Sequence, residues 1–482
     1  MSTAACDLTT GLAPYSPNAE NPWNQERARH LYMRMSFGAD YDTIQQALAN
    51  QPNTLVSSII EQGRNAPKAA APPWANWAIS QYSDFQTQLQ EQVLSWALVW
   101  MNDMLTNSFR AKLTLFWHNH FVTKLEAYAC PSYMYRYYSL LEDNVFGNFK
   151  TFAKEIGKTP AMLLFLNGVQ NTRFDPNENY ARELFELFTL GRDNGYTQQD
   201  IAGASRALTG WNGFTELCAP IGYVPLLHDP GAKTIFGKTG NYNYDGLHDL
   251  LFEERSTEIA RYICGKLYEW FVSPERDEEF INELAEELIA NDFELLPVYR
   301  ILFASERFFD EKVIGTMIKS PLDYFLSFLK LTKLPYNQDV LTLILLQAAE
   351  NGQFIFDPPD VKGWPGNRSW VDTSRLTQRW LGLEFYLYSV FQTQPDLYTN
   401  FIKELTSAYN DPEEITADLV THMTSKGFDD SRQLNNAVTA FKWEVPQNYF
   451  DDGSWNLDWI TVPPQVALLL QYVTRTPEYQ LM

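Results

Sequence analysis

The stretch LFWHNHFVTKLEAYACP, residues 115–131, decides the fold class that the sequence predicts. Residues three or four apart share one face of an α-helix. Extended back to residue 109, the stretch gives one face of mostly aromatic side chains: Leu113, Phe116, Trp117, His120 and Phe121. His118 falls on another face with three apolar residues: Leu115, Val122 and Leu125. A helix that is apolar on most sides belongs in the interior of a large helical protein.

The two histidines of this stretch are predicted to do different jobs. Residues two apart diverge by about 200° around a helix, so His118 and His120 cannot face one partner unless the helix breaks at Asn119. A buried imidazole needs a hydrogen-bond partner, a metal or a substrate. We expect His120 to point into a pocket and His118 to fix the helix against its neighbours. The alternatives are two satisfied core histidines or, with a break at Asn119, one shared cation.

The composition excludes several classes of protein. Apolar residues make up 45% of the 482-residue chain and aromatic residues 15%, which is typical of a folded protein and not of a disordered one. A net charge of −22 argues against nonspecific nucleic-acid binding, because no basic surface offsets phosphate repulsion. No apolar run is long enough for a membrane span.

The cysteines and the N-terminus bear on the cellular compartment. Cys6, Cys130, Cys218 and Cys264 form no CxxC pair, so neither a zinc ribbon nor a disulfide scaffold is indicated, and one or two long-range disulfides stay open. The first residues lack a basic segment followed by an apolar one, so no secretory signal is predicted. We therefore expect a cytoplasmic protein.

Helical periodicity runs through most of the chain and predicts a mainly α, multi-helix bundle-like assembly. Thr197 and Asp200 have the spacing of a capping box. Glycines, prolines and aromatics interrupt the periodicity over 212–246, which predicts a small irregular or β-hairpin insert. The expected helical segments are 24–38, 40–50, 84–106, 108–122, 131–166, 177–191, 197–210, 255–350 and 370–482.

The same pattern suggests four parts of the chain. Residues 1–66 form an N-terminal helical arm and linker, and 67–211 form the central helical core. The irregular insert then covers 212–254, and a C-terminal helical region, 255–482, packs on the core.

The segment FDPNENYARELFELFTLG, residues 174–191, carries a carboxylate in an unusual place. Glu178, Arg182 and Glu186 recur every four residues, an ion-pair ladder that needs no function. Glu183 lies at the margin of the apolar face, where a carboxylate is costly unless paired. It can accept from Arg206 or a histidine, or bind a cation together with Asn179. The alternative is a paired structural carboxylate.

The segment HDPGAKTIFGKTG, residues 228–240, resembles a phosphate-binding loop only superficially. The motif needs a glycine five residues before Gly237, where Ala232 stands, and no helical pattern follows. What remains is a turn that brings His228, Asp229 and Lys233 together, either at a site or as a plain turn.

The segment GQFIFDPPDVKGWPGNRSW, residues 352–370, is an ordered non-helical loop by its prolines and glycines. We expect Asp360, Lys362 and Trp364 to shape a pocket wall. A rigid connection between helices is the alternative.

Together these segments carry a family resemblance. FWHNHF, NENYARELFELFTLG, GYTQQDIAGASRALTGW, HDPGAKTIFG, KSP at 319–321 and GQFIFDPPDVKGWPG occur in this order. They resemble the large bacterial family catalogued as domain of unknown function eighteen hundred, from about His30 to near Arg379. The resemblance implies a mainly helical protein, in many members exported and encoded beside a family similar to sulfatases. It supplies no catalytic residues, and the missing signal sets this chain apart from exported members.

If the polar segments converge, the site has three predicted sets of residues. The catalytic set is His120, Glu183, His228, Asp229 and Arg206. The pocket set is His118, Asn179, Lys233, Asp360, Lys362 and Trp364. The candidate metal ligands are His118, His120, Glu183 and His228.

Imidazole with carboxylate suits a divalent metal, zinc, iron or manganese, although neither Glu-x-x-His pairs nor HExxH occur. Without a metal, the same residues suit acid/base catalysis with Arg206 or Lys233 stabilising an anion. The predicted function is an enzyme of unassigned reaction, such as a metal-dependent hydrolase or oxidoreductase. The alternative is a noncatalytic binding or assembly protein for a partner chain or a glycan.

Overall fold

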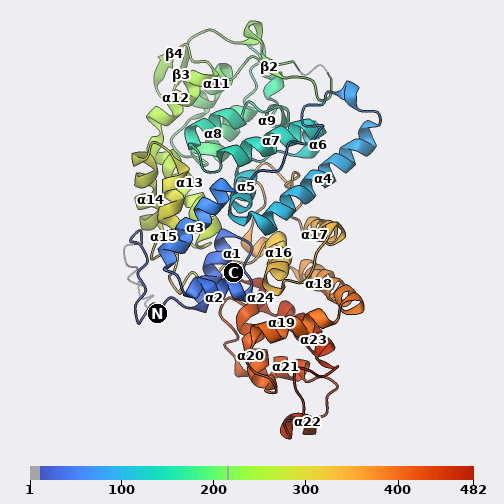
Figure 1. Ribbon diagram of the computed structural model, residues 1–482. Coiled ribbons are helices and arrows are strands. Elements are labelled where there is room, and N and C mark those ends of the chain that lie inside the picture. Colours follow the sequence, from blue (N-terminus) through green and yellow to red (C-terminus); the bar gives the residue numbers. More distant parts are fainter. Residues whose placement is uncertain (1–10, 214–215) are drawn as a thin grey trace.

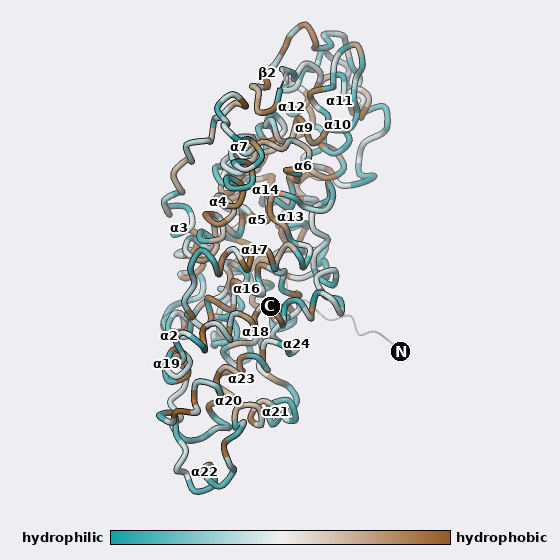
Figure 2. Tube along the Cα trace, turned by 90° about the vertical axis from the view of Figure 1, so that its right-hand side faces the viewer, coloured by the Kyte–Doolittle hydropathy of each residue, from teal (hydrophilic) through white to brown (hydrophobic). Residues whose placement is uncertain are grey.

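The computed structural model describes residues 11–213 and 216–482, and this part of the chain is mainly helical. It contains 24 α-helices and only two sheets, each of two antiparallel strands. The predicted fold class, mainly α with a small hairpin insert, is confirmed. Figures 1 and 2, a quarter turn apart, show an elongated molecule with the hairpins at one end and α22 at the other.

The N-terminal helices begin where the sequence places caps. The Asp40 side chain accepts a hydrogen bond from the Thr43 N–H at the start of the second helix, and Asp84 does the same for Thr87 at the start of the fourth. The first helix ends at Met35, before Gly38, which has a φ of +97°. The elements are α1 (Gln25–Met35), α2 (Tyr41–Leu48), α3 (Pro52–Asn65), η1 (Ile79–Gln81) and α4 (Phe85–Thr106).

The central helices surround α5. The segment 131–166, which the periodicity treats as one unit, is three helices. The side chain of Asn148 caps a new helix after Gly147, and Pro160 opens another at its first turn. The elements are α5 (Ser108–His120), α6 (Leu125–Tyr128), α7 (Pro131–Asn144), α8 (Phe149–Ile156), α9 (Pro160–Phe165) and η2 (Gly168–Gln170).

The insert is a pair of hairpins beside two helices. The predicted capping box of Thr197 and Asp200 is present. The GK dipeptide, which superficially suggested a phosphate loop, lies at the second hairpin, where Ile235 pairs with Lys238. The elements are α10 (Asn179–Glu183), η3 (Leu184–Thr189), α11 (Gln198–Ala207), β1 (Trp211–Asn212), β2 (Gly222–Tyr223), η4 (Pro225–Leu227), β3 (Lys233–Ile235) and β4 (Lys238–Gly240).

A disulfide between Cys130 and Cys218 joins the insert to the start of α7. Nearby, the Tyr133 hydroxyl donates to the carbonyl of Ala219. Cys264 is a buried free thiol, and burial raises its pKa well above the ordinary value. Cys6 lies outside the described residues. One of the long-range disulfides that the sequence left open is therefore present.

The remaining helices form the middle and the far end of the molecule, except for α12, which lies beside the hairpins (Figure 1). They are α12 (Tyr244–Glu254), α13 (Ser256–Phe271), α14 (Glu278–Ala290), α15 (Leu295–Ala304), α16 (Pro321–Thr332), α17 (Gln338–Glu350), η5 (Asn367–Trp370), α18 (Thr373–Thr393), α19 (Asp396–Leu405), α20 (Pro412–Met423), α21 (Ser431–Phe441), α22 (Asn448–Asp451), α23 (Val462–Arg475) and α24 (Pro477–Gln480).

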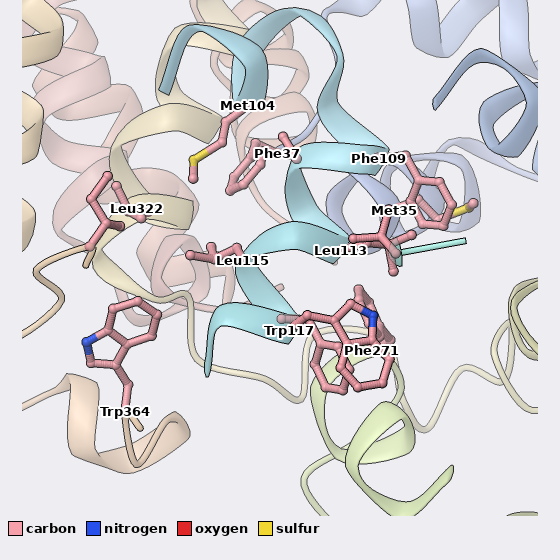
Figure 3. Close-up of a cluster of buried hydrophobic side chains, with 14 of the residues drawn as sticks. Met35, Phe37, Met104, Phe109, Leu113, Leu115, Trp117, Phe271, Leu322 and Trp364 are labelled. Atoms are coloured by element: carbon pink, nitrogen blue, oxygen red, sulfur yellow. The ribbon is translucent and has the colours of Figure 1, made fainter. Parts of the chain in front are cut away.

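One large apolar core runs through the described chain, from Tyr15 to Met482. It crosses all four predicted parts, whose boundaries stay a prediction. Figure 3 shows Leu113, Leu115 and Trp117 of α5 inside this core, with Trp364 near the end of the helix. Within the described residues, no helix combines the length and the apolar character that a membrane crossing needs.

Candidate functional site

A cavity of about 790 Å³ lies where the end of α5 meets α13 and the 352–370 loop. We call it the α5–α13 cavity. This volume is in the range of small-molecule sites. Polar and aromatic side chains both line it. The lining includes Phe116, Asn119, His120, Leu187, Tyr262, Lys266, Glu269, Trp270, Ile318, Ser320, Asp323, Asp360, Lys362, Gly363, Trp364, Asn367, Trp370 and Met482.

His118 does not line this cavity; it holds the 352–370 loop against α5. Its Nε2 accepts a hydrogen bond of 3.1 Å from the backbone N–H of Phe356. Burial lowers the pKa of His118 to about 3, so the ring is neutral and Nδ1 carries the proton. Nδ1 therefore donates to the Tyr137 hydroxyl at 2.8 Å, and this hydroxyl donates to the carbonyl of Phe121 at 2.7 Å. Both ring nitrogens are satisfied.

His120 faces the α5–α13 cavity with one nitrogen free. Its Nε2–H donates to the carbonyl of Phe188 at 3.0 Å. Burial, with a further contribution from the Lys266 charge, lowers the pKa of His120 to about 3, so the ring is neutral. Nδ1 is then an acceptor, and it has no hydrogen-bond partner among the described residues. The two imidazoles thus have different partners.

The helix that receives His120 is irregular. α10 continues directly into η3, a π-helix, and π-helical turns are frequent at functional sites. The last carbonyls of a helix lack intrahelical partners. Here the Leu187 carbonyl accepts from the Tyr262 hydroxyl at 3.0 Å, and the Phe188 carbonyl accepts from His120. The end of η3 therefore positions two side chains of the cavity wall.

The loop closes on α5 through Asn119 and Gly363. The Asn119 Oδ1 accepts from the backbone N–H of Trp364 at 2.6 Å. Gly363 has a φ of +81°, and a Cβ on it would lie 2.2 Å from the Asn119 Oδ1. Only glycine fits there. Because Oδ1 is engaged, the amide nitrogen of Asn119 is the group left for the cavity.

Two lysines of the cavity have no anionic partner. Lys266 and Lys362 make neither an ion pair nor a hydrogen bond through Nζ with any described residue. The nearest aromatic contact of Lys266 is the Tyr262 ring, 5.6 Å from its Nζ. Lys319 lies between two residues of the wall, Ile318 and Ser320. It is buried against the Tyr479 ring, and burial lowers its pKa to about 7.

The carboxylates of the cavity, in contrast, are mostly engaged. Glu269 pairs with Arg276 at 2.9 Å. Asp323 pairs with the buried Lys112 and completes the capping box of Ser320 at the start of α16. The Oδ1 of Asp360 accepts a hydrogen bond of 2.7 Å from the backbone N–H of Lys362. The indole N–H of Trp364 is buried without an acceptor among the described residues.

Glu183 lies near this wall but does not line it. Burial and the neighbouring Glu186 raise the pKa of Glu183, and Arg182, Lys362 and Arg192 partly oppose them. Its carboxylate makes no ion pair with a described residue. The Glu178–Arg182–Glu186 ladder is present beside it. Glu183 is thus a half-buried, unpaired carboxylate on the Lys362 side of the cavity.

The predicted residues of the insert form a separate group, which we call the hairpin cluster: Arg206, His228, Asp229 and Lys233. Arg206 pairs with Asp229 at 2.7 Å, not with Glu183. Lys233 donates to the carbonyls of Asp229 and Gly231. The Nδ1 of His228 lies 3.2 Å from both oxygens of Thr209. None of the four lines the α5–α13 cavity.

The predicted metal ligands are not gathered at one point. Among residues 11–213 and 216–482, no group of three or more His, Cys, Asp or Glu side chains is arranged to hold a metal ion. Of the predicted residues, the cavity brings together His120, Asp360, Lys362 and Trp364. It leaves out His118, Glu183, Asn179 and the hairpin cluster. The residues predicted from the sequence therefore do not all lie in one pocket.

The comparison with protein families agrees with the motifs. The family model described as Protein of unknown function (DUF1800) matches residues 30–481. The chain belongs to this family. The match runs well past Arg379, so the C-terminal helices are part of the DUF1800 region. No curated protein and no solved structure matches the chain.

The DUF1800 chain has site residues that sequence reasoning missed. Tyr262, Lys266, Glu269 and Trp270 lie on α13 and all line the cavity. Their spacing of three or four residues marks one helix face. In the sequence, a helix face that mixes polar and aromatic residues cannot be told from an ordinary half-exposed face, because nothing in the sequence shows which loop covers it.

Proposed function

We propose that this DUF1800 protein binds a small molecule in the α5–α13 cavity. The observation that carries the proposal is the set of polar groups that line this cavity and have no partner among the described residues: Nδ1 of His120, Nζ of Lys266 and Nζ of Lys362. Polar groups that converge on a concave cavity and make no contact within the protein are available to orient a ligand. A cluster of them around one cavity is therefore better explained by a ligand than by stability.

A cavity-filling substitution tests this function. Wild-type protein is screened against small molecules by thermal shift, and hits are measured by titration calorimetry. Leu187→Trp places an indole into the cavity and should abolish binding of the hits. Leu346→Trp makes the same change at an exposed position on α17, outside the cavity, and should leave binding intact. Hits that bind Leu187→Trp as well as wild type would refute the cavity as the binding site.

An acid/base enzyme is the second candidate, and one observation favours it. His120 is held neutral, and the pKa of Glu183 is raised, so a neutral base and a carboxyl that stays protonated to higher pH lie on the same side of the molecule. A base with a pKa of about 3 removes protons poorly, however, which ranks binding above catalysis. Substrate turnover that depends on Glu183, lost in Glu183→Gln, would reverse this ranking.

The cellular location and the partner stay predictions. The first residues predict the cytoplasm, whereas the Cys130–Cys218 disulfide favours an oxidising compartment, where such bonds persist. We propose export on this ground. Fractionation of the native host, with mass spectrometry of the Cys130 and Cys218 peptides, decides between the two. A sulfatase-like partner and a divalent metal rest on the family resemblance and on residue types alone.

A further inference from the structure

We propose that the ligand of the α5–α13 cavity is an acidic sugar, an oligosaccharide that carries carboxylate groups. The inference rests on the proposed function, because it names the chemical class that the same cavity takes. Three features of the wall carry it: unpaired ammonium groups, a single free imidazole acceptor, and a set of aromatic rings.

The charges of the wall call for an anion. Lys266 and Lys362 have no ion-pair partner among the described residues, whereas Glu269 and Asp323 are neutralised by Arg276 and Lys112. Asp360 is the one lining side-chain carboxylate without a cationic partner among the described residues, so the lining side chains, with their ion-pair partners, keep a net positive charge. Most other lysines of the chain are held by a carboxylate or a carbonyl oxygen. In a chain of net charge −22, this is a local excess of cations. A cleft with low-dielectric walls concentrates such a field and attracts anions.

The hydrogen-bond groups call for an acceptor-rich ligand with hydroxyl groups. The amide nitrogen of Asn119 adds a donor to those of the lysines. Carboxylate oxygens accept several such bonds. The Nδ1 of His120 is an acceptor and repels a carboxylate, so it needs a donor from the ligand. A hydroxyl beside the carboxylate satisfies both.

The aromatic rings call for a ligand with flat apolar faces. Tyr262, Trp270, Trp364 and Trp370 all line the cavity. Tyr and Trp combine a large apolar surface with a polar handle, which suits ligands that are apolar on one side and polar at the edge. A sugar ring has this character, with C–H groups on its faces and hydroxyls at its rim. A carboxylated sugar therefore uses all three features at once.

The test compares hexuronate trimers with their neutral esters. Full-length protein is titrated calorimetrically with trigalacturonate, trimannuronate and triguluronate, and with the methyl ester of each. At least one acid should bind. The affinity of its ester should be lower by roughly tenfold or more, and added salt should lower the affinity of the acid. Lys266→Met keeps most of the aliphatic stem and should cost roughly tenfold or more in affinity for the acid.

Lys442 supplies the matched control, because its Nζ also lacks an ion pair but faces the Phe450 ring, outside the cavity. Lys442→Met should bind like wild type. If no acid binds, or if Lys442→Met loses as much affinity as Lys266→Met, the acidic-sugar inference is overturned. If acid and ester bind equally and Leu187→Trp abolishes both, the inference fails while the cavity function stands. If Leu187→Trp binds either as wild type does, the cavity function itself fails.

Discussion

The hairpin cluster and the α5–α13 cavity both gather polar side chains but differ in how those side chains are satisfied. In the hairpin cluster, Arg206 and Asp229 pair at 2.7 Å, and Lys233 donates to two backbone carbonyls. In the cavity, Lys266, Lys362 and one nitrogen of His120 have no partner among the described residues. Residue type alone marks both regions as candidate sites. The hydrogen-bond partners distinguish them: the turn satisfies its own polar groups, whereas the cavity has polar groups without a partner in the part of the chain that the structure describes.

The comparison extends to the two histidines of α5. Both ring nitrogens of His118 are hydrogen-bonded, to Phe356 and Tyr137, and so contribute to stability. One ring nitrogen of His120 is hydrogen-bonded to Phe188, and the other has no partner among the described residues. The predictions that follow test whether stability and ligand binding divide along this line.

The largest expected effect is on the hairpin side. The Cys130–Cys218 disulfide closes a segment with a sequence separation of 88. Its loss in Cys130→Ala/Cys218→Ala should lower the free energy of unfolding by about 4–5 kcal/mol, since the unfolded chain regains loop entropy. Urea titration measures this change. Ligand binding in the cavity should survive wherever the variant stays folded.

Reductant supplies the control for this prediction. Wild-type protein with the disulfide reduced should match the double variant, whereas Cys264→Ala, which removes a thiol outside any disulfide, should respond to reductant as wild type does. A wild type that is indifferent to reductant would contradict the stabilising role of the bridge.

The next effect separates the two histidines. His118→Leu leaves the buried N–H of Phe356 without an acceptor and removes the hydrogen bond that the Tyr137 hydroxyl accepts, and should cost about 2–4 kcal/mol of stability. His120→Leu frees only the Phe188 carbonyl and should cost about 1 kcal/mol. Denaturant unfolding measures both. Equal costs would contradict the division of roles.

The sequence predicted much of this region and missed the rest for physical reasons. The apolar faces around His118 and His120 correctly placed α5 in the core, because burial follows from periodicity. The capping box of Thr197 and Asp200 was readable, because capping is local.

Convergence in space was not readable in this way. Arg206 pairs with Asp229 and not with Glu183 because the hairpin folds back on α11, and no local sequence pattern encodes this contact. Lys266 gains its importance from the 352–370 loop, which lies far along the chain. The disulfide partner of Cys130 was equally invisible, since spacing does not determine connectivity.

Acid should reveal His118 through the pH dependence of stability. Its folded pKa of about 3 lies below the unfolded value of about 6.5, so the unfolded chain takes up a proton first as the pH falls. The stabilisation is therefore complete above about pH 6.5 and is lost toward pH 3. The unfolding free energy of His118→Leu should fall less steeply than that of wild type, by about 1.4 kcal/mol per pH unit between about pH 6 and pH 4.

The variant His422→Leu is the matched comparison for this slope. His422 is buried far along the chain, and burial lowers its pKa to about 4. It should flatten the pH dependence in the same way over about pH 6 to pH 4. Parallel curves for wild type and His118→Leu would show that His118 is not held neutral by burial.

The smallest expected effect sharpens the comparison most. The side chains of Arg206 and Asp229 are 37% and 16% exposed, so their pair is worth little. A double-mutant cycle of Arg206→Met and Asp229→Asn should give a coupling of about 0.5–1 kcal/mol in urea unfolding.

Burial raises the pKa of Asp229, but hydrogen bonds from Arg206 and Gly231 outweigh it, so the pKa lies below the ordinary value. The coupling should therefore be present above about pH 4 and fade as the pH falls below it. Neither single variant should change ligand affinity in the α5–α13 cavity. If either one abolished binding while folded, the hairpin cluster would belong to the site after all, because a self-satisfied turn has no group left to offer a ligand.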